Sequence, residues 1–231
     1  MSDNTVLAVF GRKGSGKSTL VKAITREHSR VIVFDALGEY GEGSKQIAFG
    51  FDACLKALEA NVKAPKCFLS LRLRDTGDYY DLMEVVFEMP GTLFVLEETS
   101  LYCSPSVLPP ELSALVRYGR HRGLDQIYIA RRPSEVHRDL TAQADVIVSF
   151  EQREPRDLDY LRAATGEDCD SLRTMKKYRC QAWGDLSKAP LAVIEATDRP
   201  AKRFEQTRLE LDGDRENTDA REPLTEEPEG E

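Results

Sequence analysis

Short apolar runs rich in β-branched residues alternate along the chain with longer segments whose apolar positions have helical spacing. This alternation is typical of βαβ units, in which helices cover a sheet of parallel strands. The pattern predicts strands at residues 6–10, 31–35, 67–73, 93–97, 126–130 and 146–150. It predicts helices at residues 17–28, 52–62, 79–88, 110–120, 135–144 and 155–164. We therefore expect an α/β fold with a mostly parallel sheet flanked by helices.

Two more apolar runs, at residues 178–184 and 191–196, follow the last predicted helix. They predict a short C-terminal pair of strands. The sequence Asp198-Arg199-Pro200 then marks the predicted end of the ordered fold. We expect one domain over residues 1–197 and an acidic tail over residues 198–231.

The tail holds most of the net charge of the chain. Residues 212–231 contain nine acidic residues and two arginines, so they contribute −7 to a formal net charge of −8. We expect this segment to be disordered, because it has too little apolar surface to offset the entropy lost on ordering. A basic protein would be a suitable partner for it. The rest of the chain is nearly neutral, which leaves a nucleic-acid partner open.

Several protein classes are disfavoured by composition. No apolar run approaches the roughly twenty residues that a membrane-spanning helix needs, so we expect no membrane span. The five cysteines are widely spaced without a C-x-x-C pair, and there are only three histidines. Neither a disulfide framework nor a zinc site is indicated, and we expect reduced thiols in a cytoplasmic compartment.

A glycine-rich segment directly follows the first predicted strand. Residues 11–18, GRKGSGKS, fit the phosphate-binding pattern G-x-x-x-x-G-K-[ST] and open a predicted helix. We expect Lys17 to contact the β and γ phosphates of ATP, Ser18 to coordinate Mg²⁺, and Thr19 to contact the α-phosphate. The predicted nucleotide-binding residues are Gly11, Gly14, Ser15, Gly16, Lys17, Ser18 and Thr19.

Two adjacent carboxylates, Glu97 and Glu98, end the strand predicted at residues 93–97. A P-loop enzyme that hydrolyses its nucleotide needs a carboxylate near Mg²⁺ and a group that orients the attacking water. We expect Glu97 to hold the metal through water and Glu98 to polarise the lytic water. Asp35, at the end of the second predicted strand, is the nearest rival acid.

With these motifs in place, the chain resembles the HerA/FtsK superfamily of ring-forming P-loop ATPases. Residues 34–40, FDALGEY, resemble the D-x-x-G-E-Y run of the family. Residues 120–124, RHRGL, the strand at 126–130 and residues 131–134, RRPS, are similar to its R-x-x-G, strand, T-Q-R-P-S block. The resemblance covers about residues 5–196 in arrangement. It implies an ATPase that forms a ring of five or six subunits and translocates double-stranded DNA.

The resemblance also assigns roles to two arginines. Arg120 occupies the R-x-x-G position, whose arginine completes the site of a neighbouring subunit as an arginine finger. Arg131 stands where the family has a polar sensor Gln, so either it acts as a cationic sensor or hydrolysis is slow. Both belong to an arginine-rich block formed by Arg117, Arg120, Arg122, Arg131, Arg132 and Arg138. Ordinary surface ion pairing is the alternative for each of them, and the sequence does not divide them between ATP and DNA.

The size of the chain narrows the implied function. About 190 residues hold the ATPase core with almost nothing added, which resembles the genome-packaging ATPases of membrane-containing icosahedral viruses and implies host cytoplasm or virion as the location. A HerA-like ATPase partner in a DNA-processing or defence complex is the alternative in the same class. From other classes, a P-loop kinase for a small metabolite and a slow, nucleotide-regulated binding module remain open. Release of ADP without an acceptor separates the hydrolase from the kinase.

Overall fold

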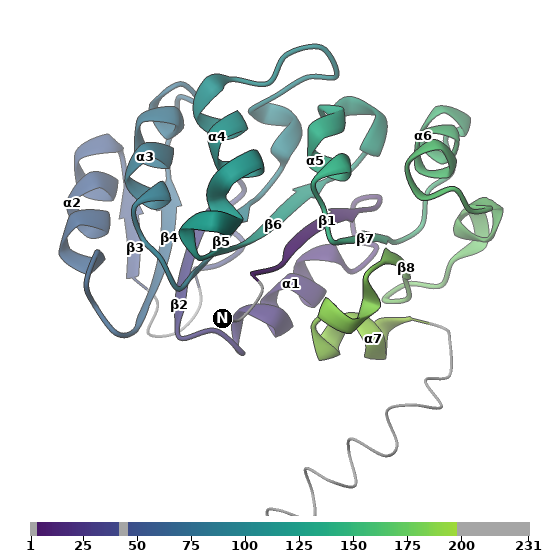
Figure 1. Cartoon of the computed structure of the whole chain (residues 1–231), viewed down its shortest axis with the longest axis horizontal. Coiled ribbons are helices and arrows are strands. Elements are labelled where there is room, and N and C mark those ends of the chain that lie inside the picture. The colour runs from purple at the N-terminus through teal and green to yellow at the C-terminus, as the bar shows by residue number, and fades with distance from the viewer. Residues whose placement is uncertain (1–3, 42–45, 198–231) are drawn as a thin grey trace, which may run out of the picture. The chain divides into compact units, whose positions relative to one another are not determined.

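The computed structural model describes residues 4–41 and 46–197 of the chain (Figure 1). In this part of the chain, eight strands form one sheet in the order β3-β4-β2-β5-β6-β1-β7-β8. The strands are β1 (Val6–Phe10), β2 (Arg30–Phe34), β3 (Gln46–Phe49), β4 (Cys67–Arg72), β5 (Thr92–Leu96), β6 (Leu124–Ala130), β7 (Val146–Ser149) and β8 (Gln181–Gly184). Neighbouring strands run parallel except β7 and β8, which are antiparallel. The predicted α/β fold with a mostly parallel sheet is confirmed.

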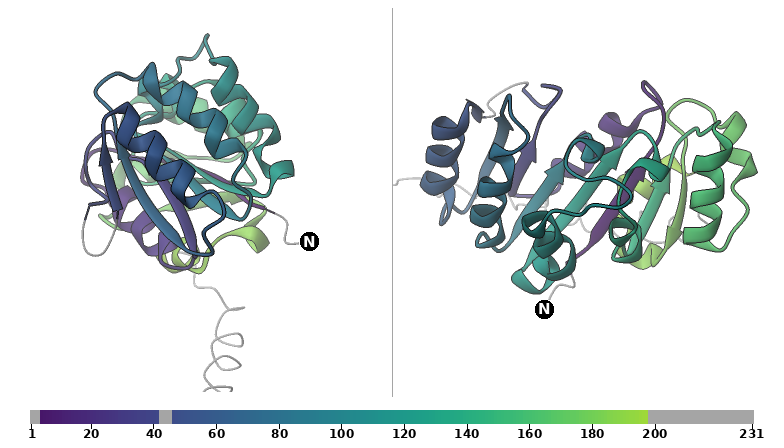
Figure 2. Two further views of the ribbon diagram at one scale, coloured as in Figure 1. Left: turned by 90° about the vertical axis from the view of Figure 1, so that its left-hand side faces the viewer. Right: turned by 90° about the horizontal axis from the view of Figure 1, so that it is seen from above.

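Helices cover both faces of the sheet, with α2, α3, α4 and α5 on one face and α1 and α7 on the other (Figures 1 and 2). The helices are α1 (Lys17–Thr25), α2 (Phe51–Asn61), α3 (Asp78–Phe87), α4 (Pro110–Tyr118), α5 (Arg138–Ala142), α6 (Pro155–Thr165) and α7 (Leu191–Ala196). Short 3-10 turns occur at η1 (Thr99–Leu101), η2 (Gly119–Arg122), η3 (Pro133–Glu135), η4 (Asp170–Thr174) and η5 (Leu186–Lys188). No described helix is long and apolar enough to cross a membrane.

The central strands are buried on both sides, which explains their continuous apolar sequences. In β2, Ile32 and Phe34 pack into the core under α2, α3 and α4, whereas Val31 and Val33 pack into the core under α1. The two cores therefore take alternate residues of the same strand. This arrangement holds the carboxyl ends of the strands in fixed positions at one edge of the sheet.

The predicted C-terminal strand pair is wrong. The segment Leu191–Ala196 is helix α7, and β8 pairs with β7 instead. Pro190 directly precedes α7, and Val193 and Ile194 are buried in the core on the α1 face. A six-residue segment with five apolar residues is compatible with both strand and helix periodicity, so the sequence pattern alone did not separate the two.

Two other elements differ from the expectation. The edge strand β3 was not predicted, because only its third residue, Ala48, is buried and the apolar pattern is weak. The helix predicted at residues 135–144 is divided into η3 and α5, since Val136 and His137 are extended and the His137 side chain caps α5 by accepting a hydrogen bond from the Asp139 N–H. The predicted acidic tail at residues 198–231 lies outside the described residues.

Candidate active site

Three predicted groups of site residues meet at the carboxyl edge of the sheet. The glycine-rich loop follows β1, the pair Glu97 and Glu98 follows β5, and Arg131 follows β6, which lies between β1 and β5. Ligand sites of open α/β sheets lie outside the carboxyl ends of the strands. The topology therefore brings together residues that are far apart in the sequence.

The backbone of the loop requires its glycines. Gly16 has φ of +124°, and a Cβ atom there would lie 2.9 Å from Cδ1 of Tyr178. Gly11 is as confined, because a Cβ atom would lie 2.6 Å from the Cβ of Phe150. The hydroxyl of Ser15 is buried without a hydrogen-bond partner. A phosphate fits this cradle, because it accepts hydrogen bonds from an orphaned hydroxyl and from the inward N–H groups of the loop.

Lys17 lies beneath the loop with its side chain buried. Its ammonium group donates hydrogen bonds to the carbonyl oxygens of Gly11, at 2.6 Å, and Arg12, at 3.2 Å. Burial lowers the pKa of Lys17, and the nearby carboxylates of Glu98 and Glu97 act against this shift. The ammonium group thus faces both acidic residues and is placed to neutralise the charge of a bound phosphate.

Glu97 is a buried acid, with 2% of its surface exposed. Burial raises its pKa to about 8, and the neighbouring acids Glu39 and Glu98 act in the same direction. Its carboxyl group accepts a hydrogen bond of 3.5 Å from the hydroxyl of Tyr40. A divalent cation fits this position, because it would compensate a carboxylate charge that the protein alone leaves poorly solvated.

Glu98 has an unusual backbone, with φ of +48° in the left-handed region. Its carboxylate accepts a hydrogen bond of 2.7 Å from Nε of Arg131. The side chain of Glu98 is 12% exposed and that of Arg131 is 46% exposed. Arg131 therefore touches the predicted water-polarising acid, a contact that the sequence did not indicate.

Asp35, the rival acid, holds a loop together. Its buried carboxylate accepts hydrogen bonds from the backbone N–H groups of Glu39 (2.8 Å) and Tyr40 (3.1 Å), from the hydroxyl of Ser70 (2.8 Å) and from Nε of Arg72 (3.0 Å). These donors occupy the carboxylate and fix Tyr40 against Glu97. Glu39 and Tyr40 were not predicted as site residues, although the D-x-x-G-E-Y run after β2, the strand next to β5, was a signal for them.

Comparison with known proteins agrees with this arrangement. Residues 4–88, which span β1 to α3 and contain the loop, match the family model described as the central domain of helicase HerA. The genome-packaging NTPase B204 of Sulfolobus turreted icosahedral virus 2 is a similar solved structure. Its complex with AMP has 21% sequence identity, covers 82% of this chain and 96% of B204, and gives a TM-score of 0.63.

The B204 complex with ATP-γS gives a TM-score of 0.62 at 20% identity with the same coverage. This chain therefore has the fold of a P-loop NTPase. The conjugation coupling protein TcpA of pCW3, solved with ATP-γS, is similar at 10% identity over 78% of this chain and 58% of TcpA, with a TM-score of 0.50. The comparison with curated protein sequences found no match.

On this P-loop NTPase fold, Arg120 does not join the other predicted site residues. It lies in η2 before β6, at the amino edge of the sheet, where its guanidinium donates a 3.1 Å hydrogen bond to Asp145. Asp145 also accepts hydrogen bonds from the N–H of Val6 and from Lys188. Arg120 thus lies at the opposite edge of the sheet from the phosphate-binding loop of the same chain.

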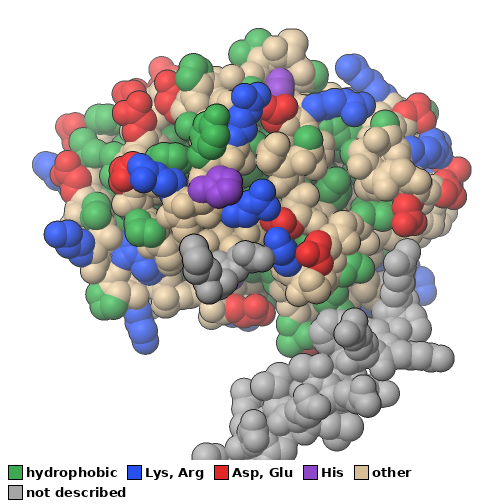
Figure 3. All heavy atoms as spheres, viewed as in Figure 1, with side chains coloured by type: hydrophobic (Ala, Val, Ile, Leu, Met, Phe, Trp, Pro, Cys, Tyr) green, Lys and Arg blue, Asp and Glu red, His purple; other side chains and the backbone are tan. Residues whose placement is uncertain are grey.

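The arginine-rich block is extensively ion-paired. The pairs are Arg117–Asp139, Arg120–Asp145, Arg122–Glu88, Arg131–Glu98 and Arg132–Asp157, and Arg138 lies over the ring of Tyr160. On the face shown in Figure 3, basic and acidic side chains are interspersed. These arginines therefore serve the packing of this chain in addition to any contact with ATP or DNA.

Proposed function

We propose that this chain hydrolyses ATP with Mg²⁺ and uses the energy to translocate double-stranded DNA. The observation that carries the proposal is the convergence of Lys17, Glu97, Glu98 and Arg131 at one edge of the sheet, around a loop with an unpartnered Ser15 hydroxyl. Two acids and a cation beside a phosphate cradle are the groups that phosphoryl transfer to water requires.

Each residue has a distinct task in this proposal. Lys17 and the loop N–H groups neutralise phosphate charge, and Ser18 and Glu97 would hold Mg²⁺, which supplies further charge neutralisation when bound. Glu98 polarises the attacking water. Arg131, whose Nε lies 2.7 Å from Oε1 of Glu98, orients that carboxylate and acts as the cationic sensor. Gly11, Gly14, Gly16 and Thr19 complete the contacts to the phosphates.

The finer function that we propose is genome packaging by a ring of five or six subunits, in host cytoplasm or virion. Its support is the similarity in fold to a protein described as a genome-packaging NTPase over 96% of that chain. The acidic tail would contact a basic or capsid protein. Electron microscopy with an ATP analogue and DNA tests the ring, and a monomer under all conditions, with ADP release only when an acceptor is present, would favour a kinase.

We further propose that Arg120 acts in trans on the site of a neighbouring subunit. Its place at the amino edge of the sheet keeps it away from the loop of its own subunit, and a ring offers a second site. To reach that site, Arg120 must release Asp145, which would keep its contact with Lys188. This exchange is compatible with a residue whose side chain is still 36% exposed.

Mixing two variants tests this role. Arg120→Ala and Lys17→Ala proteins, each nearly inactive alone, should regain part of the ATPase rate when combined, because some interfaces join an intact Lys17 to an intact Arg120. Arg122→Ala is the matched control and should stay active, since Arg122 pairs with the exposed Glu88. An Arg120→Ala protein that is fully active, or a mixture that stays inactive, would remove Arg120 from the catalytic interface.

A further inference from the structure

Two residues other than glycine have positive φ angles in the described part of the chain, and both border the phosphate-binding loop. One is Glu98, with φ of +48°, and the other is Tyr178, with φ of +66°. Such a conformation is strained for an ordinary side chain and persists only where the surroundings impose it. The chemistry proposed above gives Glu98 a role but leaves Tyr178 without one.

Tyr178 contacts the loop directly. Its backbone N–H donates a hydrogen bond of 2.8 Å to the carbonyl oxygen of Ser15. Its ring lies against Gly16, because a Cβ atom at Gly16 would be 2.9 Å from Cδ1 of the ring. Even so, 52% of Tyr178 is exposed. The ring thus borders the phosphate cradle and presents surface to solvent.

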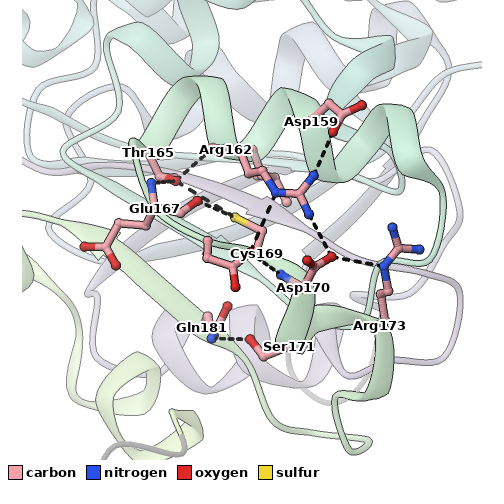
Figure 4. A network of polar contacts seen from close by, with 11 residues as sticks. Asp159, Arg162, Thr165, Glu167, Cys169, Asp170, Ser171, Arg173 and Gln181 are labelled. Atoms are coloured by element: carbon pink, nitrogen blue, oxygen red, sulfur yellow. Dashed lines mark hydrogen bonds and ion pairs between the residues drawn. The ribbon is translucent and has the colours of Figure 1, made fainter.

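The segment that carries Tyr178 is anchored on both sides. Before it, Asp170 in η4 accepts hydrogen bonds from Arg162 of α6, at 2.7 Å, and from Arg173, at 3.2 Å (Figure 4). After it, Gln181 at the start of β8 donates a 2.6 Å hydrogen bond to the hydroxyl of Ser171 (Figure 4). These contacts hold the left-handed turn in place, so the ring is held beside the loop.

The order of the strands sets the orientation of a bound nucleotide along the edge of the sheet. Glu98 and Arg131 follow β5 and β6, on one side of β1, and Tyr178 precedes β8, on the other side. A triphosphate whose γ-phosphate faces the acids of β5 has its α-phosphate and nucleoside on the side of β7 and β8. Tyr178 is the exposed aromatic residue that touches the loop on that side.

We propose that Tyr178 is the base-stacking residue of the site and that the ring supports the purine of the bound nucleotide. This proposal rests on the proposed function only in requiring that the loop binds a nucleoside triphosphate. The ammonium group of Lys177 lies over the Tyr178 ring, 4.8 Å from the ring centroid, in a cation–π contact. Stacking on an aromatic ring does not read the edge of a base. ATP and GTP should therefore bind with similar affinity, and CTP more weakly because its base is smaller.

Calorimetric binding of three ligands to the full chain in Mg²⁺ tests the assignment: ATP, GTP and inorganic tripolyphosphate. Tyr178→Gly removes the ring while keeping the backbone, because glycine adopts positive φ without strain. We expect it to weaken ATP and GTP binding roughly tenfold, a typical effect of losing one aromatic stack, and to leave tripolyphosphate binding unchanged. Tyr178→Trp should bind ATP at least as well as the original chain.

Two further variants guard against a merely structural effect. Tyr178→Asn tolerates the left-handed region and should behave as the glycine variant does. Tyr118→Ala changes another exposed tyrosine, at the end of α4, and should alter none of the affinities.

Equal loss of ATP and tripolyphosphate binding in the Tyr178 variants would mean that Tyr178 only shapes the loop. Unchanged ATP binding in these variants would equally overturn the proposal. If the original chain binds tripolyphosphate but no nucleotide, the stacking assignment fails while the loop remains a phosphate site. If it binds none of the three ligands, the proposed function fails.

Discussion

Replacing Glu97 with Gln should stabilise the nucleotide-free protein, and the gain should grow with pH. Burial raises the pKa of Glu97 from 4.5 to about 8, so the folded state binds this proton more tightly than the unfolded chain does. The resulting stability is fully present below pH 4.5 and is lost as the pH rises through 8. One pH unit is worth ~1.4 kcal/mol for one proton, which gives a loss of ~3 kcal/mol by pH 7 and ~5 kcal/mol above pH 8. A Gln side chain does not ionise, so the Glu97→Gln protein does not lose this stability as the pH rises.

Urea unfolding in EDTA, without nucleotide, between pH 5 and pH 9 measures this difference. The free energy of unfolding of Glu97→Gln should exceed that of the original chain by an amount that rises by ~1.4 kcal/mol per pH unit up to pH 8 and then levels off, with unchanged m values. Glu98→Gln makes the same chemical change one residue away and should show a smaller rise, because it removes only one of the charges that raise the pKa of Glu97. A gap between Glu97→Gln and the original chain that is constant with pH would refute the reasoning.

Three other changes have defined outcomes. Glu98→Gln should keep ATP affinity within a few-fold while lowering kcat by roughly 10²–10³, because the group that polarises water is lost; nucleotide binding and single-turnover rates measure the two effects. Arg72→Ala leaves the buried Asp35 carboxylate with fewer partners and should lower the free energy of unfolding by about 3 kcal/mol, which urea titration detects; a change below 1 kcal/mol would contradict the role given to this pair. Deletion of the chain from Asp212 onward should leave the basal ATPase rate and the thermal unfolding temperature unchanged while altering DNA affinity.

The parts of the site that follow strands were predictable from the sequence. A glycine-rich loop after one apolar run and two acids after another meet because parallel strands end at the same edge of a sheet. The family resemblance added Arg131, but not its contact with Glu98, which depends on β6 lying between β1 and β5. Strand order results from long-range pairing, which local periodicity does not encode.

The remaining differences also have physical reasons. α7 was mistaken for a strand because a segment of six residues, five of them apolar, is too short to show a period. Tyr178 was missed because it stands in an irregular turn, where neither hydrophobic pattern nor motif marks it, and its positive φ is set by contacts with Ser15 and Gly16. Asp35 was named as the rival acid because it follows a strand as Glu97 does; the four donors around it identify it as a structural carboxylate.

The costs in free energy that this fold carries are concentrated around the phosphate loop. Lys17 and Glu97 are buried ionisable groups whose pKa values are shifted against their charged forms, and Glu98 and Tyr178 hold left-handed backbones. A bound nucleotide adds negative charge beside Lys17, and a bound cation adds positive charge beside Glu97, so each ligand relieves one of these two costs. Because each cost is reduced only when the ligand is bound, the reduction adds to the binding free energy of that ligand. Mg²⁺ should therefore add more to the thermal stability of the ATP complex in the original chain than in Glu97→Gln, in which the buried charge that Mg²⁺ would compensate is already absent.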